Sequence, residues 1–145
     1  MHTETRCLCL ALAAGVTFQL FYLGAQPFAA GLIPVPWDKL AHLAVFAVLT
    51  TLLWIGSASR MPFAVIATAI AIGALDELHQ ADLPGRFADT ADFLADACAA
   101  TSTGVFLFLL HARRKASERD ATTGLTAQAH TRSSQESLGA GKTAR

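Results

Sequence analysis

The sequence has few charged residues for its length. Only 15% of its 145 residues are Asp, Glu, Lys or Arg, whereas hydrophobic residues make up 53%. Soluble domains carry roughly 25% charged residues. The shortage of charge argues against a soluble enzyme, and the apolar excess argues against a chain that is disordered throughout. The length fits one domain and leaves little room for a second.

The sequence also lacks a net charge. It contains 11 basic and 11 acidic residues, so no basic excess indicates nucleic-acid binding, and we expect no nucleic-acid partner. The charge is nevertheless uneven along the chain. Residues 1–110 hold four basic and eight acidic residues, and residues 111–145 hold seven basic and three acidic ones. The sequence therefore predicts an apolar body with acidic sites, followed by a basic tail.

Motifs of disulfide, cofactor and hydrolase chemistry are missing. The three cysteines, Cys7, Cys9 and Cys98, leave an odd count without CxxC spacing, which argues against a disulfide framework or a zinc motif. HExxH, GxSxG and P-loop patterns are absent as well. From the sequence we assign no cofactor, no metal site and no catalytic residue, and we favour a protein that is not an enzyme.

Four apolar stretches occupy most of the first 110 residues, over residues 7–27, 39–56, 62–80 and 91–110. About 20 helical residues cross the roughly 30 Å hydrocarbon core of a bilayer. The uninterrupted apolar part of the third stretch is shorter than this, so its helix must continue through residues 76–80 and place polar groups at membrane depth. We predict an all-α fold, a four-helix transmembrane bundle, in which the first stretch is a retained span rather than a cleaved signal peptide.

The composition changes after residue 110, where the chain becomes polar and lacks aromatic residues. Such a segment cannot bury enough apolar surface to become ordered. We predict a transmembrane domain over residues 1–115 and a disordered cytoplasmic tail over residues 116–145. Arg6, Arg60 and the basic cluster at residues 113–115 flank alternate ends of the spans, which places both termini in the cytoplasm. The cluster acts either as a stop-transfer signal, which we favour, or as a site for anionic lipid.

Polar residues gather at the opposite end of the predicted spans. Spacings of three, four and seven residues place them on single helix faces. A charged side chain at the bilayer centre costs about 2.5–3.5 kcal/mol, so we expect these side chains to face one another in a pocket open to the outer side. This polar cluster comprises Asp38, Lys39, His42, Glu77, Gln80, Arg86, Asp89 and Asp92.

Three motifs in the polar cluster resemble the VanZ-like membrane proteins. They are Asp38-Lys39-x-x-His42, Glu77-x-x-Gln80-x-x-x-Pro84-Gly85-Arg86 and Asp89-x-x-Asp92, and the likeness covers roughly residues 6–110. The resemblance implies a small multi-pass protein of the bacterial inner membrane, and a role in tolerance of glycopeptide antibiotics such as teicoplanin. Two positions depart from the pattern, because this chain has Asp96 where Asn is expected and Ala100 where Gly is expected.

Several of these residues also allow a purely structural interpretation. Pro84 and Gly85 favour a turn, and Arg86 either only follows that turn or binds a phosphate or carboxylate group. His42 fits a packing role, proton transfer or metal ligation. Glu77 is either the ion-pair partner of Arg86 or part of a functional site.

The remaining acidic and basic residues at this end have more ordinary expected roles. Asp38 fits a helix cap, and Lys39 fits an interfacial side chain that extends its ammonium group toward water. We expect Asp76 and Asp82 to occupy solvated positions at a helix end and in a loop.

Three classes of function remain. The first, which we favour, is a cell-envelope protein whose outward-facing polar pocket binds a membrane lipid, a lipid-linked envelope precursor or a glycopeptide. The second is a membrane-embedded enzyme in which His42, Glu77, Asp89 and Asp92 supply acid/base groups or hard metal ligands. The third is a proton or ion pathway, which is disfavoured because the other halves of the spans hold few ionisable groups.

Overall fold

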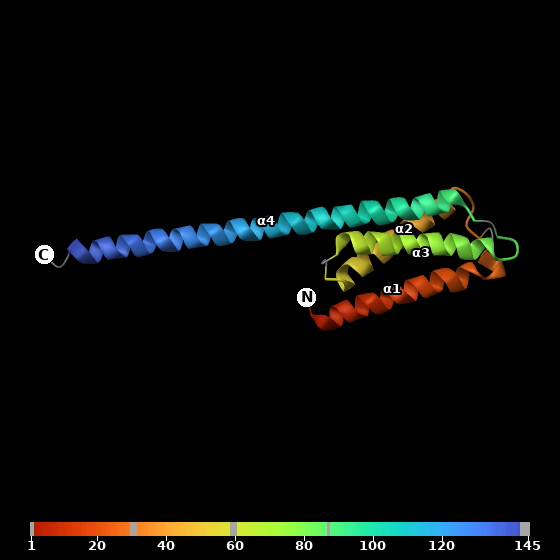
Figure 1. Ribbon diagram of the computed structural model, residues 1–145, viewed down its shortest axis with the longest axis horizontal. Helices are drawn as coiled ribbons and strands as arrows, with labels where there is room; N and C mark the ends of the chain where they lie inside the picture. The colour runs from red at the N-terminus through yellow and green to blue at the C-terminus, as the bar shows by residue number, and fades with distance from the viewer. Residues whose placement is uncertain (1, 30–31, 59–60, 87, 143–145) are drawn as a thin grey trace. The chain divides into compact units, whose positions relative to one another are not determined.

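A computed structural model describes residues 2–29, 32–58, 61–86 and 88–142 of the chain, with side chains as far as Gly124. The chain divides into two compact units, Met1–Phe108 and Leu109–Arg145. Four helices follow one another: α1 (Thr3–Gly24), α2 (Trp37–Gly56), α3 (Pro62–Ala81) and α4 (Thr90–Lys142), with a short 3-10 helix η1 (Pro27–Ala29) after α1 (Figure 1). Arg60, one of the basic residues behind the predicted orientation, lies outside the described residues.

The predicted all-α fold with four membrane-spanning helices is confirmed. Helices α1, α2 and α3 have 22, 20 and 20 residues, and they and the Thr90–Gly124 part of α4 are all long and apolar enough to cross a bilayer. Pro62 lies in the first turn of α3, where a missing backbone N–H costs nothing. Large apolar side chains such as Leu12, Phe18 and Phe63 are exposed. This outward display fits helices that face lipid, so the chain is a membrane-embedded protein.

The first unit is held together where helices approach closely. Its core contains Ala13, Phe46, Leu49 and Ala99, from α1, α2 and α4. A Cβ atom at Gly104 of α4 would lie 2.4 Å from Cγ1 of Ile66 on α3, so the absence of a side chain allows these two helices to touch. Small residues serve this purpose between membrane helices, where lipid removes the hydrophobic drive for association.

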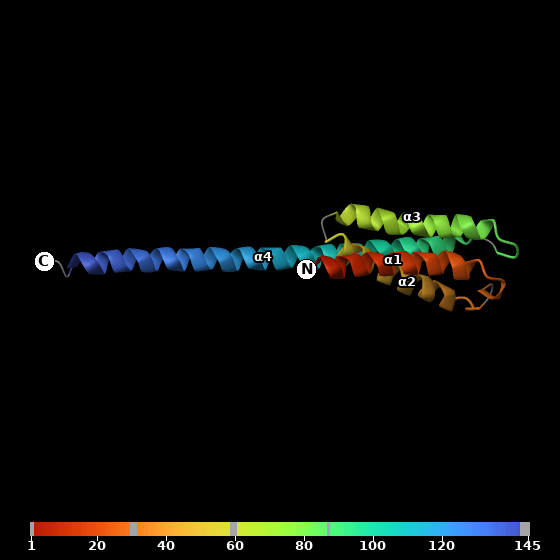
Figure 2. The ribbon, with the colours of Figure 1, turned by 90° about the horizontal axis from the view of Figure 1, so that it is seen from below.

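Helix α1 packs against α2 at the end of the unit where α1 begins and α2 ends. A Cβ at Gly56 would lie 2.6 Å from Cδ2 of Leu10, and Nε of Arg6 donates a hydrogen bond to the Gly56 carbonyl oxygen over 3.2 Å. Arg6 thereby satisfies one of the last carbonyls of α2, which have no partner inside that helix. The connections from α1 to α2 and from α3 to α4 lie together at the other end of this unit (Figures 1 and 2).

The second unit is the C-terminal part of α4. Helical backbone continues to Lys142, over the segment that the sequence predicts to have no packed core. The prediction rested on the lack of apolar residues to bury, and every side chain from Ala112 to Gly124 is indeed exposed. Ala, Arg, Lys and Glu favour helical backbone, but a helix whose side chains pack against nothing is only marginally stable. The first unit ends at Phe108, and the domain boundary at residue 115 stays a prediction.

Candidate functional site

The residues of the polar cluster come from the start of α2, the end of α3, the start of α4 and the connection before it. If α-helical rise is 1.5 Å per residue, His42, Glu77 and Asp96 lie about 6–9 Å inside their helix ends. They therefore lie within the candidate membrane spans rather than in the loops. At this depth a charged group needs a partner or a polar cavity.

Lys39 forms ion pairs with three carboxylates in this cluster. Its Nζ lies 3.1 Å from Asp38 Oδ2, 2.6 Å from Asp89 Oδ2 and 2.5 Å from Asp92 Oδ1. The hydrogen bond from Lys39, followed by the one from the Ala91 backbone N–H, lowers the pKa of Asp89, which precedes α4. Three carboxylates hold the ammonium group of Lys39 within the cluster, and its expected extension toward water stays a prediction.

Asp38 is not the cap of α2, because the N-cap residue is Pro36 and no side-chain cap hydrogen bond forms there. Its Oδ1 accepts the backbone N–H of Lys39 over 2.8 Å. That N–H, in the first turn of α2, also donates to the Pro36 carbonyl oxygen over 3.2 Å. Asp38 therefore contributes both to the helix end and to the ion pair with Lys39.

His42 connects α2 to α4. Its Nδ1 lies 2.9 Å from Oδ1 of Asp96, and its Nε2 lies 4.0 Å from Oδ2 of Asp92. Asp96 is fully buried. A Cβ atom at Gly73 of α3 would lie 3.0 Å from Oδ2 of Asp96, so this glycine leaves the room that the Asp96 carboxylate occupies. Asp96 thus places a buried acidic group beside the residues of the polar cluster.

Glu77 and Asp76 present two more carboxylates from α3. Oε2 of Glu77 accepts the backbone N–H of Asp89 over 2.6 Å, and Oδ2 of Asp76 accepts Nε2 of Gln80 over 2.8 Å. The solvated position expected for Asp76 is wrong, because its side chain is 1% exposed. As predicted, α3 continues past residue 76, to Ala81, but Asp76 lies on the buried side of this last part of the helix rather than in solvent.

Arg86 lies in the turn between α3 and α4. Gly85 has a φ of +78°, as expected for a glycine that reverses the chain. Nη1 of Arg86 donates to the Ala29 carbonyl oxygen over 3.3 Å, while its buried Nε has no hydrogen-bond partner. Among the described residues Arg86 forms no ion pair, so the pairing with Glu77 that the sequence allowed is not made. The Nε–H group of Arg86 therefore remains available to donate a hydrogen bond to a ligand.

A pocket of about 1020 Å³ opens beside these residues. One wall is apolar and consists of one face of α1 together with the segment after η1. The other boundary is polar and is formed by Asp38, His42, Asp76, Gln80, Arg86 and Asp92. Five of these six belong to the predicted polar cluster. The sixth, Asp76, was not part of that prediction.

The buried residues Asp76 and Asp96 were absent from the predicted site. A signal for each was present in the sequence. Asp76 stands four residues before Gln80, and Asp96 stands four residues after Asp92, so each shares a helix face with a residue of the polar cluster. Comparison with protein-family models, with curated proteins and with solved structures gives no match to this chain.

Proposed function

We propose that this protein is a VanZ-like protein of the bacterial inner membrane that binds an amphipathic, phosphate-bearing lipid of the cell envelope. The proposal rests on the lining of the pocket, which is apolar along one wall and polar along the opposite boundary. A long apolar wall on α1 suits a hydrocarbon chain, and the polar boundary beside it suits a charged headgroup. A lipid-linked envelope precursor has both parts.

The polar boundary offers one positive group that is free to bind an anion. Lys39 is already neutralised by three carboxylates, whereas Arg86 keeps its Nε–H without a partner. A guanidinium group binds phosphate oxygens through parallel N–H donors. We therefore assign the phosphate to Arg86, and the hydroxyl groups of an attached sugar to the neighbouring carboxylates.

The apolar wall has space for a chain. Leu12, Val16, Leu20 and Leu23 line it from α1, and Gly15 lies between them. A Cβ atom at Gly15 would find no other atom within 4 Å. An acyl or prenyl chain could lie in this space along α1, parallel to the surrounding lipid.

We further propose that the pocket opens to the outer side and that both termini are cytoplasmic. Arg6 lies at the opposite end of the first unit, beside the end of α2, which fits the excess of basic residues on the cytoplasmic side. Glycopeptide antibiotics act at the outer face of this membrane. A protein that sequesters or presents an envelope lipid there would alter tolerance of teicoplanin.

The experiment is a survival assay in a susceptible bacterium that expresses the chain. The wild type should raise survival with teicoplanin more than with vancomycin. Arg86→Lys keeps the charge but loses the fork of the guanidinium group, so it should abolish the effect while the protein remains in the membrane. Asp82→Asn, in the exposed loop, is the matched control and should behave as the wild type. Full protection by Arg86→Lys would contradict the proposal.

A membrane-embedded enzyme is the second candidate, and the pairing of His42 with Asp96 favours it. A carboxylate that orients an imidazole ring is a common arrangement in general acid–base catalysis. The test is to incubate the purified protein with a polyprenyl phosphate and measure inorganic phosphate. Release by the wild type that is lost in His42→Gln would establish this reaction, and no release would exclude it for that substrate.

A further inference from the structure

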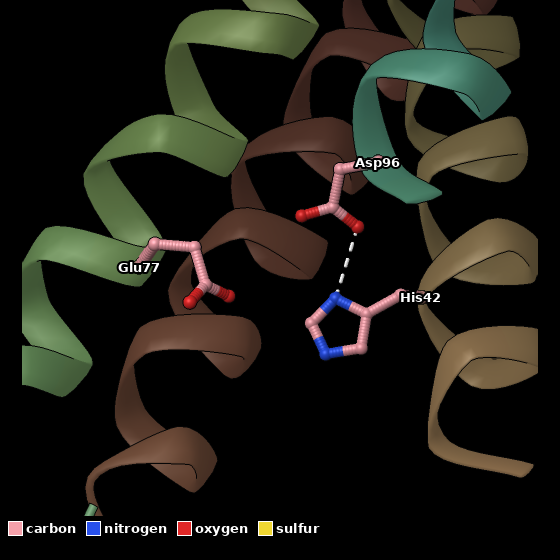
Figure 3. Close-up of side chains that lie close together, drawn as sticks. All are labelled: His42, Glu77 and Asp96. Atoms are coloured by element: carbon pink, nitrogen blue, oxygen red, sulfur yellow. Dashed lines mark hydrogen bonds and ion pairs between the residues drawn. The ribbon is translucent and has the colours of Figure 1, made fainter. Parts of the chain in front are cut away.

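Three side chains from three helices converge at the buried end of the polar cluster. His42 of α2, Glu77 of α3 and Asp96 of α4 each offer one ligand atom, and these atoms all lie within 4.8 Å of one another. Figure 3 shows the two carboxylates and the imidazole ring around a common space, with the hydrogen bond between His42 and Asp96 on one side of it. A single ion at the centre of this space could contact all three groups.

Two carboxylate oxygens at this point have no partner. Oε1 of Glu77 and Oδ2 of Asp96 are buried and accept no hydrogen bond, and the residues that carry them are 7% and 0% exposed. A buried carboxylate oxygen without a donor is costly, and buried charges are normally paired or bound to a metal. Both orphaned atoms belong to the group that converges with His42.

The basic side chains nearby do not satisfy these oxygens. Lys39 pairs with Asp38, Asp89 and Asp92, and Arg86 donates to the Ala29 carbonyl. In the part of the chain that the structure describes, neither Lys nor Arg forms an ion pair with Glu77 or Asp96. Two carboxyl groups thus share one imidazole partner, and a divalent cation would balance their charge when both are ionised.

We propose that His42, Glu77 and Asp96 bind one divalent transition-metal ion of the Zn²⁺ or Mn²⁺ type. One imidazole nitrogen and two carboxylate oxygens match the preferences of these ions, whereas Ca²⁺ and Mg²⁺ favour oxygen ligands alone. His42 also lines the pocket, so a further coordination position is accessible to an oxygen of a bound ligand. The proposal does not depend on the lipid-binding function, because the metal alone is its ligand.

The experiment uses the untagged full-length protein in detergent, stripped with a chelator and titrated with Zn²⁺ and with Mn²⁺. Binding is followed by elemental analysis after desalting and by the shift in melting temperature. The wild type should bind one ion of at least one of these metals tightly and melt at a higher temperature with it. His42→Gln, Glu77→Gln and Asp96→Asn should each weaken binding by at least about tenfold. Asp76→Asn changes a buried carboxylate outside the three ligands and should retain binding.

The variants must also be shown to fold. Asp96→Asn and Glu77→Gln remove a buried charge but keep an oxygen that can accept the hydrogen bond from His42 or from the Asp89 backbone, so without metal they should melt no lower than the stripped wild type, and their helical circular dichroism should be unchanged. A stabilised but metal-insensitive Asp96→Asn would support the site. Equal metal binding by the wild type and all three ligand variants would overturn the proposal. Equal loss in Asp76→Asn would also overturn it, because the acidic cluster as a whole, rather than these three ligands, would then attract the ion.

Discussion

Nδ1 of His42 lies 2.9 Å from Oδ1 of Asp96, and this contact joins the start of α2 to the start of α4 within the bundle. The two residues are 54 positions apart in the sequence. Because Asp96 is fully buried, its carboxylate depends on this histidine for its one hydrogen bond in the described structure.

Removal of this histidine should therefore destabilise the bundle. His42→Phe fills a similar volume but leaves Asp96 without a donor, and loss of one member of a buried pair costs roughly 3 kcal/mol or more. Adding Asp96→Asn removes the buried charge and should recover most of the stability. Denaturant unfolding in detergent measures this double-mutant cycle. A double variant as unstable as His42→Phe alone would show that the pair carries no coupling.

Acidification should weaken the contribution of Asp89. The hydrogen bond from Lys39 lowers the pKa of this carboxyl below its usual value of 3.8. A lowered pKa in the folded state gives stability that is complete above the unfolded pKa and is lost as the pH falls through the folded one. The difference in melting temperature between wild type and Asp89→Asn should thus be constant from pH 7 to about pH 5 and shrink below about pH 4. A difference that grows as the pH falls would contradict the assigned ion pair.

Close packing of α3 and α4 can be tested at Gly104. Gly104→Val would place its side chain against Ile66, whose Cγ1 would lie 2.4 Å from the new Cβ. Overpacking of this kind costs about 1–3 kcal/mol. Ile66→Ala removes the clashing atoms, so the pair of substitutions should be more stable than Gly104→Val alone. Additive losses in the double variant would show that the two helices do not meet there.

The orientation of the chain gives another prediction. Asp82 lies in the connection between α3 and α4, at the end that carries the polar cluster. In a background with the three native cysteines replaced by serine, Asp82→Cys should react with a membrane-impermeant thiol reagent in intact cells. A cysteine in place of Thr3, at the start of α1, should react only after the cells are opened. The reverse pattern would invert the proposed topology.

The fold could be predicted from the sequence because membrane helices are specified by the length and continuity of apolar stretches. The predicted stretch 39–56 became α2 (Trp37–Gly56), and Pro62 marked the start of α3. The positions of Asp76 and Asp96 were harder to predict. Their spacing places each on a helix face with a residue of the polar cluster, but how deeply such a residue is buried depends on how the helices cross and on gaps such as the one left by Gly73.

The polar cluster was predicted as a set but not as a network. Helical spacing indicated that its members share faces, and the cost of exposing charge to lipid indicated that these faces converge. Which side chains then pair with one another depends on differences of a few ångströms in the distances between them, and helical spacing does not determine these distances. Lys39 therefore binds three carboxylates, and Glu77 accepts the Asp89 backbone N–H instead of Arg86.

Lipid binding in the pocket is the central claim, and filling the pocket tests it. The probe is undecaprenyl phosphate, added to the purified protein in detergent, with bound lipid counted by native mass spectrometry. Gly15→Leu projects a side chain into the pocket where a Cβ meets no other atom, so the fold should tolerate it. Ala14→Leu, on an exposed neighbouring position of α1 that does not line the pocket, is the matched control.

The wild type and Ala14→Leu should each retain one molecule of undecaprenyl phosphate, and Gly15→Leu should lose it at least about tenfold, the equivalent of roughly 1.4 kcal/mol. Melting temperatures should be alike for the two variants. Equal retention by Gly15→Leu and Ala14→Leu, or no retention by the wild type, would contradict the assignment of this pocket as a lipid-binding site.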